Sequence, residues 1–144
     1  MKRKFLKIHQ IQIVPYDIRN GETNVMLVRS LENKQLVFPK GTIKKKETMY
    51  EAACRELFEE TGTSIVGNLE DPLCVYTYIR NKKLRNVVVY PAFVVDLGVA
   101  YPEYDKREKK WNEVWRWKAG TQANPRAYAR TTKKLLKMFM KGNK

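Results

Sequence analysis

Cysteine and histidine are scarce in this chain, and long hydrophobic runs are missing from it. The 144 residues include two cysteines and one histidine. Two cysteines make no disulfide framework, so a reduced intracellular location is expected, cytoplasmic and also nuclear. No apolar run approaches the roughly 20 residues of a membrane helix, and the N-terminus lacks a signal-peptide pattern. We therefore expect neither membrane insertion nor secretion.

Acidic residues are also few, and they are unevenly placed. The chain has 15 acidic against 29 basic residues, a formal net charge of +14. Five of the acids fall within residues 47–60, where Arg55 is the one base, so this stretch carries −4 and the remainder +18. A basic body around one acidic spot favours a polyanionic partner that meets a metal ion there. The alternative is a surface made basic for solubility or by compositional bias.

What is present predicts one globular domain over residues 1–144. The hydrophobic content is 43% and the charged content 31%, which suits a folded, soluble protein. Apolar alternation predicts strands over 5–15, ended by Pro15, and over 24–29, with Asn20-Gly21 as the hairpin turn between them. Shorter or later strands are predicted at 35–38, 73–79, 87–95 and 113–118.

The expected elements follow one another as strands, a helix, strands and a helix. This order predicts a mixed sheet with helices packed on it. Residues 80–85 are predicted to form a basic turn, and Pro91 implies an edge position or a bulge in the strand 87–95. A final helix is expected over 126–140. The lone His9 is interpreted as an ordinary surface or edge residue.

A central helix is marked by its ends. Thr48 is a good N-cap, Glu51 stands where a capping-box partner belongs, and Gly62 suits the C-terminal cap. On this helix Glu56, Glu59 and Glu60 are spaced i, i+3, i+4, so their carboxylates share one face. Like charges in that arrangement repel one another. A hard cation such as Mg²⁺ turns the repulsion into a binding site.

Residues 41–63 resemble the Nudix box. The pattern is a glycine, five residues, a glutamate, seven residues and then R-E-L-x-E-E-x-G, and it is fulfilled from Gly41 through Glu47 to Gly62. Thr63 departs from the aliphatic residue usual at that place, which concerns packing rather than chemistry. The resemblance implies an α/β/α sandwich around a central mixed sheet. It also implies hydrolysis of a diphosphate linkage with Mg²⁺ or Mn²⁺.

The resemblance further implies roles for individual residues. Glu56 and Glu60 match the metal-binding carboxylates, and Glu59 matches the residue that orders a metal-bound water or accepts its proton. The backbone carbonyl of Lys40 matches an extra metal ligand. Arg55 stands in the catalytic group beside the three glutamates. Gly41, Glu47 and Arg55 match a structural brace between loop and helix.

The substrate is predicted less directly. Residues 37–41 (VFPKG) resemble the branch that includes diphosphoinositol polyphosphate and diadenosine polyphosphate phosphohydrolases. In that branch, the positions that contact substrate correspond here to Arg29, Ser30, Lys40, Lys82, Lys83, Arg85 and Lys110. We therefore expect an inositol pyrophosphate or a dinucleoside polyphosphate as the small polyanionic substrate, with no obligate protein partner.

Two alternatives remain open at this stage. The first is the same chemistry on the 5′ end of RNA, since a related branch carries a similar FPQG segment. The second is a protein that binds RNA or another polyanion without cleaving it. A pure binder has no need of three clustered carboxylates, which favours an enzyme.

Overall fold

The computed structural model describes residues 7–113, and eight strands and one helix lie within them. The strands are β1 (Gln10–Arg19), β2 (Glu22–Arg29), β3 (Leu36–Val37), β4 (Lys40–Thr42), β5 (Thr63–Ile65), β6 (Cys74–Arg80), β7 (Lys83–Asp96) and β8 (Lys109–Glu113). The helix α1 spans Met49–Thr61. The helix predicted over 126–140 and most of the strand predicted over 113–118 lie outside the described residues.

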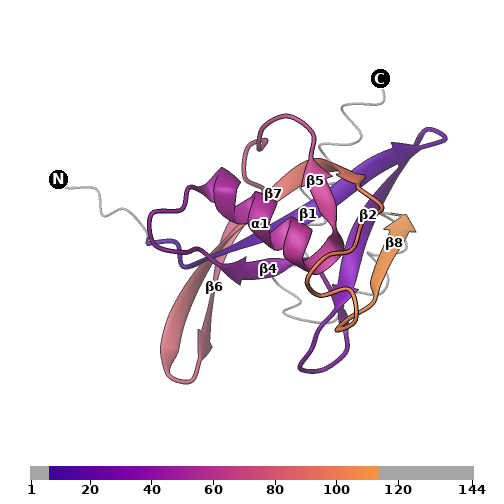
Figure 1. Ribbon diagram of the computed structural model, residues 1–144. Coiled ribbons are helices and arrows are strands. Elements are labelled where there is room, and N and C mark those ends of the chain that lie inside the picture. Colours follow the sequence, from indigo (N-terminus) through magenta and orange to yellow (C-terminus); the bar gives the residue numbers. More distant parts are fainter. Residues whose placement is uncertain (1–6, 114–144) are drawn as a thin grey trace.

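The strands form a mixed sheet, and α1 lies across it (Figure 1). Along its main path the order is β3-β2-β1-β7-β5, with β4 paired to β1, β6 to β7 and β8 to β2. β1 and β7 run parallel, whereas the other pairs are antiparallel. The predicted α/β fold class is confirmed for this part of the chain.

The prediction that Pro15 ends the first strand is wrong. β1 continues to Arg19, and Pro15 lies where its neighbour changes from β4 to β2. The N–H of Ile13 donates to Pro39 on that side, so the N-position of Pro15, two residues on, also points there. A residue without an N–H costs no ladder bond at such a junction.

Pro91 follows the same logic in β7. That strand is central rather than an edge, because β1 pairs with it on one side throughout residues 87–93. On the other side of β7, the pairing with β6 reaches as far as Val89 and the pairing with β5 starts at Val94. Pro91 lies in the gap between these two partners. The predicted edge position thus holds locally and is wrong for the strand as a whole.

Two other turns refine the predictions. Asn20 and Gly21 both have positive φ, at 52° and 77°, which confirms the tight hairpin between β1 and β2. The basic turn predicted over 80–85 is shorter, because only Asn81 and Lys82 turn, with φ of 52° and 62°. Lys83 already belongs to β7.

The helix is held on the sheet by one apolar cluster. Ala52, Ala53 and Leu57 are fully buried against Ile11 and Ile13 of β1 and against residues of β5 and β7. A second cluster, built from β1, β2, β6 and β7 around Val14, Leu27 and Val89, fills the other side of the sheet. The predicted cap is confirmed, since Thr48 Oγ1 accepts from the Glu51 N–H and Glu51 Oε1 from the Thr48 N–H, both at 3.1 Å. Such caps stabilise a helix by about 1 kcal/mol.

Candidate metal and phosphate site

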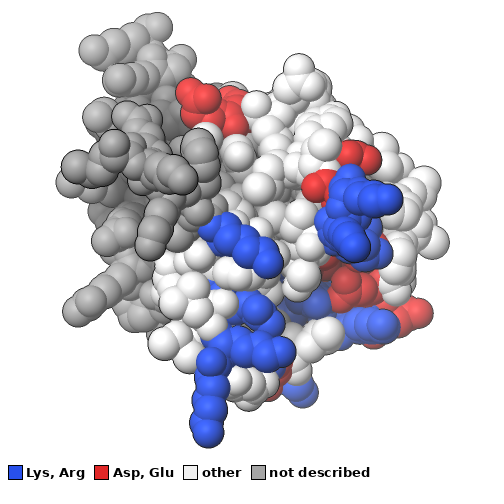
Figure 2. Space-filling view, turned by 90° about the vertical axis from the view of Figure 1, so that its left-hand side faces the viewer, with Lys and Arg blue, Asp and Glu red and all other residues white. Residues whose placement is uncertain are grey.

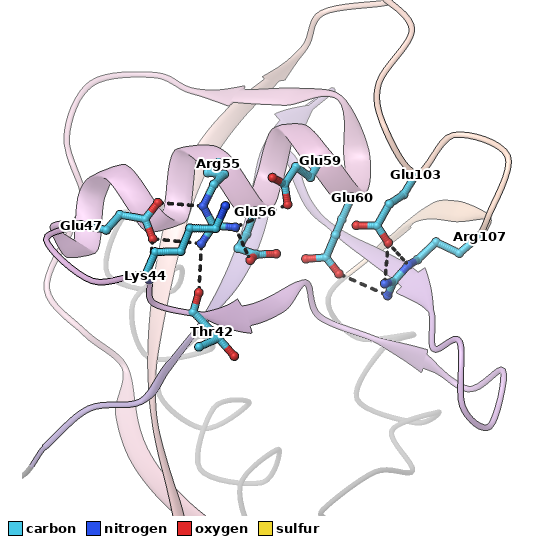
Figure 3. A network of polar contacts seen from close by, with 9 residues as sticks. All are labelled: Thr42, Lys44, Glu47, Arg55, Glu56, Glu59, Glu60, Glu103 and Arg107. Atoms are coloured by element: carbon cyan, nitrogen blue, oxygen red, sulfur yellow. Dashed lines mark hydrogen bonds and ion pairs between the residues drawn. The ribbon is translucent and has the colours of Figure 1, made fainter.

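The apolar residues of α1 pack on the sheet and so fix the orientation of the helix. In this orientation Glu56 faces β4 and Glu60 faces the loop that follows β7. Glu56 and Glu60 are buried, with 8% and 2% of their surfaces exposed, whereas the Glu59 side chain keeps 35%. Figure 3 shows Glu56 and Glu60 between two arginines, Arg55 on one side and Arg107 on the other. Three carboxylates and two guanidinium groups therefore share this face of the helix.

Arg55 joins the loop before α1 to the helix. Its Nε and Nη2 donate to the two oxygens of Glu47 at 2.7 and 2.9 Å, and Nη2 also donates to the carbonyl of Thr42 at 2.9 Å. The hydrogen bond from Arg55 lowers the pKa of Glu47 to about 2. That bond in turn raises the pKa of Arg55 further above its usual range. The geometry is that of the brace predicted from the sequence.

Arg55 also reaches the glutamates. Its Nη1 donates to Glu56 at 2.6 Å and lies 3.4 Å from Glu59. Burial raises the pKa of Glu56 even so, because desolvation outweighs the attraction of Arg55. Glu59 is thus the least buried and the most loosely held of the three carboxylates.

Gly41 is required by the space that Glu56 fills. A Cβ built on Gly41 would lie 2.0 Å from the carboxyl carbon of Glu56. Real atoms do not approach so closely, so any side chain here would push the Glu56 carboxylate out of place. The glycine lets β4 come into direct contact with the acidic face of α1.

Glu60 has a different partner, Arg107, which the sequence reasoning did not single out. Arg107 Nη1 lies 3.2 Å from Glu60 Oε1, and its Nη2 lies 2.7 Å from Glu103. Glu60 Oε2 is buried and has no hydrogen-bond partner. Burial, and then the neighbouring Glu56 carboxylate, raise the pKa of Glu60 to about 9.

The backbone carbonyl of Lys40 faces the same side of β4 as that of Thr42. Residues 39, 41 and 43 exchange hydrogen bonds with β1 or the segment before it, so the carbonyls of Lys40 and Thr42 point away from β1. The bond from Arg55 to Thr42 places that side against α1. The Lys40 carbonyl is therefore turned toward the helix that carries the glutamates.

These groups fit a hard divalent cation. Carboxylate and carbonyl oxygens are the ligands that Mg²⁺ takes, and a buried carboxylate oxygen without a partner is costly unless a cation or donor meets it. Within residues 7–113, however, no three acidic, histidine or cysteine side chains converge as a ready ligand set. As they stand, the carboxylates are held by arginines rather than gathered around one point.

A cavity of about 530 Å³ opens beside this cluster. It is lined by β1, β4 and β6, by residues 30–33, and by Glu60 and Arg107. A smaller cavity of about 290 Å³ shares Gln10, Thr42, Tyr78 and Arg80 with it and adds Lys83 and Arg85. Figure 2 shows Lys and Arg side chains gathered in groups on one side of the molecule, with acidic side chains among them.

The structure brings some of the predicted substrate residues together and leaves others apart. Ser30 and Lys40 line the larger cavity, and Lys83 and Arg85 line the smaller one. Arg29 faces a third cavity next to Ser30, where its Nη1 donates to the carbonyl of Lys34 at 3.1 Å. Lys82, in the turn, and Lys110, on β8 opposite Leu27, line none of these three cavities.

Tyr76, Arg80 and Arg107 lie in the cavity wall and are not among the site residues predicted from the sequence. Tyr76 lines the cavity with Tyr78, and the two hydroxyls bind Gln12 and Gln10 of β1. Their i, i+2 spacing on a strand was a usable signal for a shared face. Arg80, which pairs with Glu32, falls within the stretch 80–85 that the sequence predicts as a basic turn. Arg107 had no signal, because the folding of residues 97–108 places it.

The sequence also matches a known protein family. A NUDIX domain profile matches residues 9–139. The chain belongs to the Nudix family.

Thr63, the departure from the box pattern, is buried at 1% exposure, and its hydroxyl is 2.7 Å from that of Thr61.

Two relatives illustrate the similarity in sequence. Nudix hydrolase 4 of Arabidopsis thaliana is 32% identical over 111 residues, which cover 68% of this chain and 51% of the relative. Nudix hydrolase 21, chloroplastic, of the same plant is 32% identical over 104 residues, covering 68% and 52%. The chain spans about half the length of these curated relatives. Other relatives carry the word mitochondrial in their names, so the cytoplasmic location stays a prediction.

Solved structures share the fold at low sequence identity. A Caenorhabditis elegans Ap4A hydrolase superposes with a TM-score of 0.64 at 19% identity, covering 90% of this chain and 99% of that one. The NUDIX domain of Shewanella oneidensis NrtR, complexed with ADP ribose, gives a TM-score of 0.68 at 15% identity, covering 92% and 90%. Within the described part of the chain, no helix is long and apolar enough to cross a membrane.

Proposed function

We propose that this chain hydrolyses a diphosphate linkage in a small, highly phosphorylated substrate with the help of Mg²⁺ or Mn²⁺. One observation carries the proposal. Buried Glu60, with an oxygen that lacks a partner, lines a cavity whose wall includes Lys40 and Arg107. Buried Glu56 lies directly behind Gly41 of the same wall. Anionic ligands for a cation and cationic groups for phosphate thus stand side by side.

The burial and contacts of each residue suggest its role in the reaction. Glu56, Glu60 and the Lys40 carbonyl would hold the cation, which supplies charge neutralisation and a more acidic coordinated water when bound. Glu59 is the most exposed of the three carboxylates and is only loosely held by Arg55, so a water molecule can reach it, and we assign it the role of proton acceptor. Arg55 orients Glu56 through its bonds to Glu47 and Thr42.

The proposed substrates are diphosphoinositol polyphosphates, diadenosine polyphosphates or both. Many basic groups around one opening suit a ring or chain crowded with phosphates. The name of the C. elegans neighbour, an Ap4A hydrolase, supports the dinucleotide member of this pair. Tyr76 and Tyr78 in the cavity wall offer aromatic faces for a nucleobase, although the Lys40 ammonium already lies 4.5 Å from the ring centre of Tyr78.

A substrate panel tests the proposal. The full chain is incubated with Mg²⁺ and, separately, a diphosphoinositol polyphosphate, a diadenosine polyphosphate and 5′-triphosphorylated RNA, with EDTA as the control. We expect release of phosphate or nucleotide from one or both of the first two, and none in EDTA. Turnover of RNA alone would instead establish the 5′-end activity, and binding without turnover of any substrate would establish a polyanion-binding protein.

A single substitution tests the proposed proton acceptor. Glu59→Gln keeps the size of the side chain and removes its basic oxygen, so we expect kcat to fall by about 10²- to 10⁴-fold. The KM and the melting temperature should change little, because the side chain is partly exposed. Glu22→Gln, on the exposed end of β2, is the matched control. Activity within a few-fold of wild type would assign the role to another group.

A further inference from the structure

Arg107 reaches the acidic face of α1 from a separate segment of the chain. Its side chain is 14% exposed and touches Glu60 and Glu103. The backbone of this segment is fixed to the helix, since the Glu103 N–H donates to the carbonyl of Glu59 at 2.9 Å. The guanidinium is therefore positioned by the fold beside the C-terminal half of α1.

The two contacts of Arg107 are unequal. Glu103 Oε1 accepts from both Nε and Nη2, at 3.1 and 2.7 Å, whereas Glu60 is approached by Nη1 alone at 3.2 Å. The second oxygen of Glu60 stays without a partner. Arg107 is thus anchored on Glu103 and contacts only one oxygen of Glu60, so the contact with Glu60 is the one that can be exchanged.

We propose that Arg107 is the internal cation that holds Glu60 until a divalent metal ion takes its place, and that the released guanidinium then binds a phosphate of the substrate. The inference rests on the proposed function and adds a residue to it. It also accounts for the absence of a ready three-ligand set within residues 7–113, because guanidinium groups stand among the carboxylates.

The surroundings of Arg107 suit the second part of this role. Arg107 lines the large cavity and also a neighbouring one of about 270 Å³, which Arg29, Lys34 and Lys106 line as well. A guanidinium anchored on Glu103 at this shared wall can present its planar fork to phosphate oxygens. Metal and phosphate would then each favour the binding of the other, since each removes the contact between Arg107 and Glu60.

Direct metal binding tests the first part. Mn²⁺ is titrated into the full chain at fixed pH and followed by the electron paramagnetic resonance of free Mn²⁺, without substrate. We expect Arg107→Gln to bind Mn²⁺ about five- to tenfold more tightly than wild type. Arg107→Lys keeps a charge and should lie between the two. Arg19→Gln removes an equal charge at the far end of β1 and should leave the affinity unchanged.

Phosphate binding tests the second part. Methylenebisphosphonate, which cannot be hydrolysed, is titrated calorimetrically with and without Mn²⁺. We expect Mn²⁺ to tighten its binding to wild type and to Arg19→Gln, but much less to Arg107→Gln. Circular dichroism establishes that each variant is folded.

The outcomes separate this inference from the proposed function. Mn²⁺ bound by Arg107→Gln with unchanged or weaker affinity would overturn the inference and leave the hydrolase proposal standing. Loss of the Mn²⁺ effect in Arg19→Gln as well would overturn the role of Arg107 in phosphate binding. A wild-type chain that binds no Mn²⁺ would overturn the proposed function itself.

Discussion

At the scale of single residues, two arginines divide the acidic face of α1. Arg55 has four partners, Glu47, Thr42, Glu56 and Glu59, and so resembles a fixed part of the scaffold. Arg107 holds Glu60 through a single contact. The difference matters because a cation can replace a guanidinium at a single contact with a carboxylate at much lower cost than one that is tied to that carboxylate within a network.

The brace predicts a pH dependence of stability. The pKa of Glu47 falls from 4.5 to about 2 in the folded chain, chiefly through the hydrogen bond from Arg55. A carboxyl with a lowered folded pKa contributes stability that is complete above its unfolded pKa and is lost as pH falls through the folded one. Glu47→Gln should therefore reduce the free energy of unfolding by about 1–2 kcal/mol at pH 7.

That difference should shrink between pH 4.5 and 2, the interval between the unfolded and folded pKa values of Glu47. Urea unfolding of wild type and variant at several pH values measures it. Glu22→Gln, at an exposed position, is the control and should show no such convergence. A difference that stays constant down to pH 2 would contradict the lowered pKa.

At the scale of elements, the sequence located what local signals encode. The capped helix, the Asn20-Gly21 hairpin and the strands around 24–29, 73–79 and 87–95 were predicted and found. β4 and β5 were missed, since KGT and TSI are too short and too polar to show a strand period. They are strands only because parts of β1 and β7 that no other strand covers are there to pair with them.

The site residues likewise fall into those that local sequence signals locate and those that only the folded sheet brings together. The box placed Glu47, Arg55 and the three glutamates on one loop and helix, and their mutual contacts follow from that local spacing. Arg107, Arg80 and Tyr76 reach the cavity from elements distant in sequence. Such convergence depends on the packing of the sheet, which a periodicity in the sequence does not encode.

The C-terminal end of α1 yields a prediction for an element boundary. The helix has no basic residue in its last turn, and Lys109 of β8 supplies the charge instead. Its Nζ donates to the carbonyl of Thr61 at 2.8 Å and to Asp96 at 2.7 Å. Lys109→Met should lower the free energy of unfolding by about 1–3 kcal/mol, because both acceptors lose a charged donor. Urea unfolding measures it.

The neighbouring residue provides the control for this substitution. Lys110 is exposed on the same strand. Lys110→Met should change the free energy of unfolding by less than about 0.5 kcal/mol. An equal loss from both variants would mean that charge on β8, rather than the contact with α1, stabilises the fold.

At the scale of the whole molecule, the question is whether the charge of +14 serves the substrate. Four of the 15 acids lie on α1, while Lys83, Arg85 and Arg80 gather at the smaller cavity beside the site. A field arranged this way draws polyanions to the opening and is screened by salt. A merely compositional charge would have no preferred place.

A salt series separates these two explanations. Between 50 and 300 mM NaCl we expect the KM of wild type for its best polyanionic substrate to rise about tenfold, with kcat nearly constant, because exposed charges act on encounter and binding. The double variant Lys83→Gln with Arg85→Gln should start with a higher KM and show a shallower dependence on salt. Lys7→Gln with Arg19→Gln removes the same charge from positions outside the three cavities and should retain the wild-type slope. If both double variants flatten the curve equally, net charge alone governs substrate binding, and the grouping of basic residues at the cavity has no part in it.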